Sequence, residues 1–203
     1  MNEEEQLEDE LVLEALRDAG VHAISTQDFM QKREPYPAAI PVLIKMLGRV
    51  RTYMIKEIIV RALGSKEAKG KAEHALISEF ESSLHDDSVD AKAFRWAIAN
   101  TLEIIGGKGD VDAFIRLLLD PRSSNARGML SLAAAKTKDK KVIPILMDYL
   151  NSDNLQGFAA RGLGILRAKE AVPSLSLLAG ETKNSWVRRE AIKALDRINK
   201  SGQ

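Results

Sequence analysis

The stretch Val187–Leu195, VRREAIKAL, decides the fold. Its apolar residues Val187, Ala191 and Leu195 stand four and eight positions apart, so they lie on one face of an α-helix. The same apolar spacing recurs upstream in steps of 29 to 39 residues. The residues that take the place of Leu195 are Leu63, Leu102, Ala134 and Leu163. The sequence therefore predicts five copies of one helix.

A second helix precedes each copy. In three copies it begins with proline, at Pro41, Pro144 and Pro173, and a missing N–H costs nothing in the first helical turn. The other two copies lack the proline but keep the apolar spacing. Polar, turn-forming residues separate the helices of each pair, as in 85–88 and 151–154. One pair cannot bury its apolar face alone, so the chain is predicted to be an all-α superhelix, a solenoid of stacked pairs.

These repeats resemble HEAT repeats. The short period and the segments Ala-Ile-Pro (39–41) and Val-Arg-Arg-Glu-Ala (187–191) are similar to the HEAT-like repeats of phycobilisome lyases. The resemblance covers roughly 38–199 and implies about five HEAT-like helix pairs whose second helices line a concave surface. It does not select an activity, because HEAT-like repeats occur in adaptors, lyases, hydroxylases and DNA glycosylases.

Composition places the chain in a broad class. Aromatic residues make up 5% of it and cysteine is absent, which excludes disulfides and thiolate chemistry. The acidic start is unlike a signal peptide, and no apolar run reaches the roughly 20 residues of a membrane span. We therefore expect a cytoplasmic protein without membrane contact. It should consist of an N-terminal helical cap at 1–37 and a continuous repeat domain at 38–203.

Charge is concentrated at the N-terminus. Residues 1–18 carry eight acids and one base, a net charge of −7, whereas the remainder carries +8. Leu7, Leu11, Ala15 and Leu16 form an apolar stripe that predicts a capping helix, with Gly20 as its stop. That helix is either a polar end for the solenoid or an autoinhibitory acidic arm. A short helix near Ser25 is expected next, with Phe29 and Met30 packed inward.

Basic residues recur near the start of the second helices. The position of Arg188 is taken in the other copies by Lys56, Arg95, Arg127 and Gln156. One interpretation is an internal ladder in which these cations bond turn acids of neighbouring repeats, such as Asp87, Asp120, Asp153 and Glu181. The other is a surface for an acidic partner. Its candidate residues are Arg95, Trp96, Arg127, Arg161, Arg188, Arg189 and Lys193.

The aromatic residues are likewise divided between internal packing and a binding surface. Trp96 stands beside Arg95 and, if exposed, would be a typical interface anchor. Trp186 and Phe158 are expected to be packing residues. Lys136–Lys141 is expected to be a solvated turn.

Catalytic and metal-binding motifs are not found. His22, His74 and His85 are far apart, and none has a second ligand at metal spacing. The paired His-Glu motifs of HEAT-like di-iron hydroxylases are missing too. Gly106–Asp110 lacks phosphate-loop spacing and follows a helix, which predicts an interrepeat turn. We therefore predict no catalytic, cofactor or metal site.

Three functions remain. A non-enzymatic scaffold for protein–protein interaction leads, because the solenoid offers a binding surface and no catalytic constellation. Nucleic-acid binding, as in HEAT-like alkylpurine DNA glycosylases, is the alternative suggested by the basic body and by residues 186–189. The third, a bilin lyase-like subunit, follows from the repeat resemblance alone.

Overall fold

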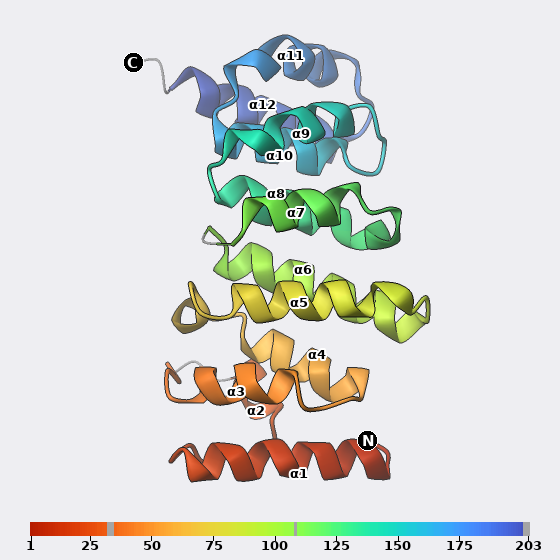
Figure 1. The fold of residues 1–203 in the computed structure, drawn as a ribbon. Coiled ribbons are helices and arrows are strands. Elements are labelled where there is room, and N and C mark those ends of the chain that lie inside the picture. The colour runs from red at the N-terminus through yellow and green to blue at the C-terminus, as the bar shows by residue number, and fades with distance from the viewer. Residues whose placement is uncertain (32–34, 108, 201–203) are drawn as a thin grey trace. The chain divides into compact units, whose positions relative to one another are not determined.

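The chain is built from helices. The structure is a computed structural model that describes residues 1–31, 35–107 and 109–200, and for Met30 and Gln31 only the backbone. Every regular element in those ranges is an α- or 3₁₀-helix, which confirms the all-α prediction (Figure 1). Internal contacts divide the chain into two compact units, 1–106 and 107–203. The division falls in the turn that contains Gly106, Gly107 and Gly109.

The N-terminal unit holds a long first helix and two helix pairs. Its elements are α1 (Glu3–Asp18), α2 (Asp28–Gln31), α3 (Ala39–Leu47), α4 (Tyr53–Ala62), η1 (Lys66–Ala68), α5 (Glu73–Ser82), η2 (Ser83–His85) and α6 (Val89–Ile105). Helix α3 pairs with α4 and α5 with α6, while α4 also packs against α6. Helix α1 packs on both α3 and α4, so the predicted cap belongs to the same unit as these repeats.

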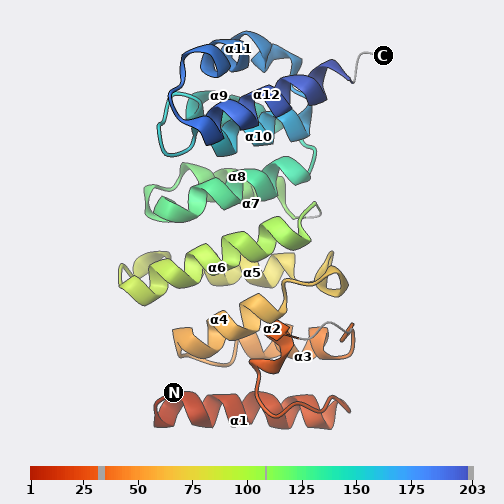
Figure 2. The same ribbon diagram turned by 180° about the vertical axis from the view of Figure 1, so that it is seen from behind.

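The C-terminal unit holds three further pairs. Its elements are α7 (Val111–Leu119), η3 (Pro121–Ala126), α8 (Arg127–Lys136), η4 (Lys140–Val142), α9 (Ile143–Tyr149), α10 (Gln156–Leu166), η5 (Lys169–Ala171), α11 (Val172–Glu181) and α12 (Ser185–Asn199). The second helices α8, α10 and α12 pack side by side (Figure 2). Within each unit, helices contact neighbours in sequence, which is the packing of an α-solenoid.

Most of the predicted core positions are buried, whereas Leu155 and Leu195 are half-buried. The central apolar residue of each second helix is fully enclosed: Ile59, Ile98, Leu130, Ala159 and Ala191. Small residues bring the helices close, since a Cβ added to Gly164 of α10 would lie 2.7 Å from the Cα of Ala194 in α12. The first-turn prolines are also found, with Pro144 and Pro173 at the starts of α9 and α11.

Helix α1 is rotated relative to the prediction. Val12 and Leu16 are its buried apolar residues, so the predicted stripe holds for Leu16 and, half-buried, for Ala15, whereas Leu7 and Leu11 are exposed and were wrongly included. The reason is polar: Asp9 turns inward, where its Oδ1 accepts hydrogen bonds from the backbone N–H and the hydroxyl of Thr26. That bond, together with the contacts of Glu8 to Arg51 and Thr52, holds the helix in this rotation.

The ends of α1 and the short α2 agree with expectation. Gly20 has φ 74° and terminates α1 as predicted. Ahead of α2 the Ser25 hydroxyl accepts a hydrogen bond from the Gln27 N–H, and Phe29 is buried. The side chain of Met30 lies outside the described residues.

Candidate functional site

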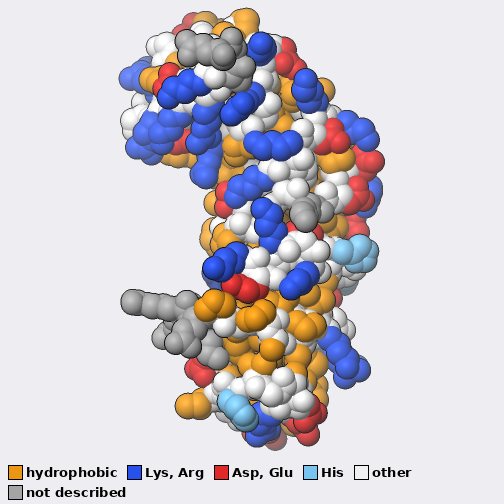
Figure 3. Space-filling view, turned by 90° about the vertical axis from the view of Figure 1, so that its left-hand side faces the viewer, with side chains coloured by type: hydrophobic (Ala, Val, Ile, Leu, Met, Phe, Trp, Pro, Cys, Tyr) orange, Lys and Arg blue, Asp and Glu red, His pale blue; other side chains and the backbone are white. Residues whose placement is uncertain are grey.

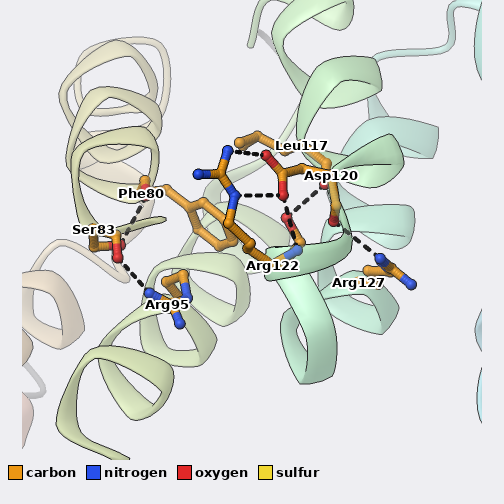
Figure 4. Close-up of polar contacts among 8 residues, drawn as sticks. Phe80, Ser83, Arg95, Leu117, Asp120, Arg122 and Arg127 are labelled. Atoms are coloured by element: carbon orange, nitrogen blue, oxygen red, sulfur yellow. Dashed lines mark hydrogen bonds and ion pairs between the residues drawn. The ribbon is translucent and has the colours of Figure 1, made fainter. Parts of the chain in front are cut away.

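Arg95 is part of the core. Its side chain is only 1% exposed, and its Nη1 donates a hydrogen bond to the carbonyl oxygen of Ser83 at 2.5 Å (Figure 4). The same Nη1 donates to the carbonyl oxygen of Asp86 at 2.8 Å. These carbonyls lie where α5 ends, and the last carbonyls of a helix have no partner within it. Arg95 is therefore corrected from a candidate contact for a partner to an internal structural residue.

Two more arginines, which stand at the position equivalent to Arg95 in later repeats, also donate to backbone carbonyls. Arg127 Nη2 donates to the carbonyl oxygen of Asp120 at 3.0 Å, and Arg188 Nη2 donates to that of Thr182 at 2.5 Å. In each case the carbonyl follows the first helix of the arginine's own pair. The ladder thus lies within each repeat and ends on peptide carbonyls, whereas the sequence predicted carboxylates of neighbouring repeats.

Lys56 stands at the equivalent position of the first repeat, and it does link two repeats. Its Nζ on α4 lies 2.5 Å from the Glu79 carboxylate on α5, and both side chains are mostly buried. The acid comes from a helix and not from a turn. The predicted cross-repeat ion pair therefore exists here in a different form.

The turn acids Asp86 and Asp120 accept hydrogen bonds from residues of their own turns. Asp120 Oδ1 accepts from the backbone N–H and the guanidinium of Arg122, which holds the pKa of Asp120 at about 2 (Figure 4). Asp86 likewise accepts from the Ser88 N–H, which lowers its pKa. Its other oxygen accepts from the Tyr53 hydroxyl at 3.0 Å. Both carboxylates are therefore already bonded by groups of the protein, Asp120 within its own turn and Asp86 both within its turn and to α4.

Both tryptophans are half-buried. The Arg61 guanidinium lies 5.9 Å from the centre of the Trp96 ring, so the ring on α6 is partly covered by a side chain of α4. Trp186 meets Phe158 edge to face with 5.0 Å between ring centres. This contact confirms the predicted packing role of Trp186 and Phe158.

Arg127 remains accessible. It is half-buried and lines an open pocket of about 460 Å³ in the C-terminal unit, together with Asn125, Asn154 and Phe158. Its Nη2 is bonded to the Asp120 carbonyl and its Nε is buried without a hydrogen-bond partner, while the side chain as a whole is half-buried. A partner can therefore reach Arg127 but not Arg95.

The remaining candidates lie on α10 and α12 and are exposed. Arg189 and Lys193 are one helical turn apart, and both approach the Glu190 carboxylate, at 3.8 and 3.3 Å. Arg161 takes the position of Lys193 in the preceding repeat, on the helix that packs against α12. Arg188 projects from another side of α12.

One exposed cation was missed by the sequence analysis. Arg197 follows Lys193 by four residues, so Arg189, Lys193 and Arg197 form a row along α12. That i, i+4, i+8 spacing could have revealed it. We call Arg161 and this row the basic face.

Net charge differs sharply between the units. The C-terminal unit has 17 Lys and Arg against 10 Asp and Glu, or +7, whereas the N-terminal unit carries −6. Figure 3 shows Lys and Arg side chains gathered over the C-terminal unit. Such a field attracts negatively charged partners.

Metal sites and membrane spans were also sought. The described residues contain no group of three or more His, Asp or Glu side chains placed to hold a metal ion. Across the same ranges, no helix combines the length and apolar character needed to cross a membrane.

Comparison with known proteins gives no relative. No protein-family model, curated protein sequence or solved structure matches the chain.

Proposed function

We propose that the chain is a non-enzymatic helical-repeat scaffold that binds an acidic protein partner through the basic face. The observation that carries the proposal is the row of Arg189, Lys193 and Arg197, three exposed cations on one side of α12. Two of them share the single carboxylate of Glu190, which is 8% exposed, so positive charge remains at the surface. Carboxylates of a partner would complement this charge.

The kind of repeat supports the same proposal. Exposed faces of stacked helices are the binding surfaces of repeat proteins. The HEAT-like sequence pattern adds that second helices line the binding face, and Arg161 and the row of α12 lie on two of them. Arg127, at the edge of its pocket, would extend the contact.

Charge reversal tests the proposal. A partner that co-purifies with the wild-type chain and re-forms the complex from purified components should bind the variant Arg189→Glu/Lys193→Glu at least about tenfold more weakly. The matched control is Lys140→Glu/Lys169→Glu, which reverses two exposed charges elsewhere in the C-terminal unit. We expect the control to bind like the wild type. Equal affinity of the wild type and the α12 variant would overturn the proposal.

Nucleic-acid binding is the second candidate, favoured by the net charge of +7 in the C-terminal unit. The same variants separate it from the first. Phosphate attraction depends on total charge, so a short DNA duplex should bind both double variants more weakly, with an affinity that falls steeply as salt rises. No gel shift at low salt would exclude this candidate.

A further inference from the structure

The outward face of α1 has two leucines at its centre. Leu7 is 68% exposed and Leu11, one helical turn later, is 45% exposed. Helical spacing places carboxylates on both sides of this pair. We call the set the acidic face, and it consists of Glu3, Glu4, Leu7, Glu10, Leu11, Glu14 and Asp18.

The acids of α1 fall into two groups. Glu5 accepts from Asn2 in the capping box, Glu8 accepts from the N–H groups of Arg51 and Thr52, and Asp9 binds Thr26. These three hold the helix in place. The five acids of the acidic face are exposed, so the excess negative charge is directed outward.

Helix α12 has a face of opposite character that no other described residue covers. On α10, the residues that meet α12 are small: a Cβ on Gly157 would collide with Trp186, and one on Gly164 with Ala194. The equivalent positions of the next repeat, on α12, are occupied by Arg189 and Asp196. Large charged side chains thus stand where the close packing of a further repeat needs small ones.

An apolar side chain lies among these charges. Ile192 stands at the position equivalent to Ala160 of the preceding repeat and is 47% exposed. Arg188, Arg189 and Lys193 are its neighbours on the helix surface. The outward face of α12 therefore has an apolar residue surrounded by three cations and one acid, Asp196, and is basic overall, whereas that of α1 has an apolar centre and an acidic margin.

We propose that copies of this chain associate head to tail, with the acidic face of α1 in one copy packed against α12 of the next. Leu7 and Leu11 would cover Ile192, while Glu10 and Glu14 would face Arg189 and Lys193. The helices have 16 and 15 residues, so each is about 23 Å long and they match in length. The idea rests on the proposed function, because it names the acidic partner of the basic face.

The contact would be weak and dependent on salt. One pair of helices buries little area, and exposed charges are screened over about 10 Å at 0.1 M salt and about 3 Å at 1 M. Because the two faces differ, the contact is heterologous and adds further copies instead of stopping at two, unless a ring closes.

Sedimentation equilibrium of the full chain measures this association. In about 50 mM NaCl the average mass should exceed the 22.4 kDa of one chain and rise with concentration. In about 500 mM NaCl the association should weaken by about tenfold or more. A mass of one chain at every concentration and salt would overturn the head-to-tail contact. The proposed function would still stand if another acidic protein bound the basic face.

Charge swapping identifies the faces. Glu10→Lys/Glu14→Lys and Arg189→Glu/Lys193→Glu should each remain monomeric, because each places like charges at the contact. An equimolar mixture should associate again, since each variant then meets a complementary face. Lys140→Glu/Lys169→Glu should associate like the wild type. Association of either α1 or α12 variant alone, or none in the mixture, would overturn the proposal.

Discussion

The indole ring of Trp186 fills the space beside Gly157, because a Cβ built on Gly157 would stand 2.1 Å from Trp186 Cζ3. The same relation occurs one repeat earlier, where a Cβ on Gly128 would lie 2.7 Å from the Phe158 ring. Phe158 and Trp186 also touch each other. In both cases an aromatic ring on the second helix of one repeat fills the space beside a glycine on the second helix of the repeat before it.

This packing makes Gly157 intolerant of a side chain. Gly157→Ala forces Trp186 outward and should lower the free energy of unfolding by about 1–3 kcal/mol, measured by urea denaturation. The control Gly180→Ala meets no atom within 4 Å and should leave stability unchanged or raise it by up to about 1 kcal/mol. In a Trp186→Ala background the cost of Gly157→Ala should shrink. Equal effects at both glycines would contradict the packing role.

Arg95 and Arg188 occupy the same repeat position but differ in burial. Arg95→Ala removes the guanidinium that donates to the Ser83 and Asp86 carbonyls and opens a cavity, and the Ser83 carbonyl keeps only the Asp86 N–H. The variant should cost about 2–4 kcal/mol in urea denaturation. Arg188→Ala exposes a single carbonyl to water and should cost less than about 1 kcal/mol. Similar costs for both variants would mean that burial does not decide the value of this bond.

The helical repeat could be predicted from sequence because it is a pattern of side chains. Apolar residues at spacings of four and eight mark one helix face wherever they occur, and the buried Ile59, Ile98 and Ala191 follow that rule. The role of Trp186 was also predictable, since it directly precedes a core position. No knowledge of contacts between distant residues was needed to predict these helices.

The arginine ladder and the rotation of α1 could not be predicted in the same way. The acceptors of Arg95 and Arg127 are backbone carbonyls, and every residue has one. Helix α1 has two rows of apolar residues, and the bond from Thr26 to Asp9, together with the contacts of Glu8, holds one of them inward. That bond joins residues 17 positions apart, so helical periodicity carries no sign of it.

Alkaline pH should destabilise the protein through its three tyrosines. Burial raises the pKa of Tyr36, Tyr53 and Tyr149, and burial with the Asp86 carboxylate raises that of Tyr53 to about 12. Above the ordinary value of 10.0 the unfolded chain loses protons that the folded chain keeps, so stability falls as pH rises. Denaturation at several pH values checks this. Tyr53→Phe should make the fall shallower.

Phenolate absorbance gives an independent measurement. In the folded protein it should grow mostly above pH 10, and in denaturant it should grow around pH 10. A folded protein whose tyrosines all titrate at the ordinary value would refute the burial described for them.

Glu8 attaches α1 to the repeats by capping another helix. Its carboxylate accepts from the N–H of Arg51 at 2.6 Å, the N–H of Thr52 at 3.0 Å and the Thr52 hydroxyl at 2.5 Å. Thr52 is the N-cap residue of α4, where free N–H groups favour a negative charge. Burial raises the pKa of Glu8, but these hydrogen bonds outweigh it, so the pKa is lowered overall.

Glu8→Gln should therefore loosen α1 selectively. The neutral amide has one acceptor oxygen in place of two, and we expect the docking of α1 to weaken by about 1–2 kcal/mol, seen as faster hydrogen exchange of its amides. Because the pKa of Glu8 is lowered, its contribution is present above the ordinary value of 4.5 and disappears as pH falls through the lowered one. The two proteins should thus converge in acid. Glu10→Gln, on the exposed side of the same helix, should exchange like the wild type, and faster exchange there would show that net charge and not the cap holds α1.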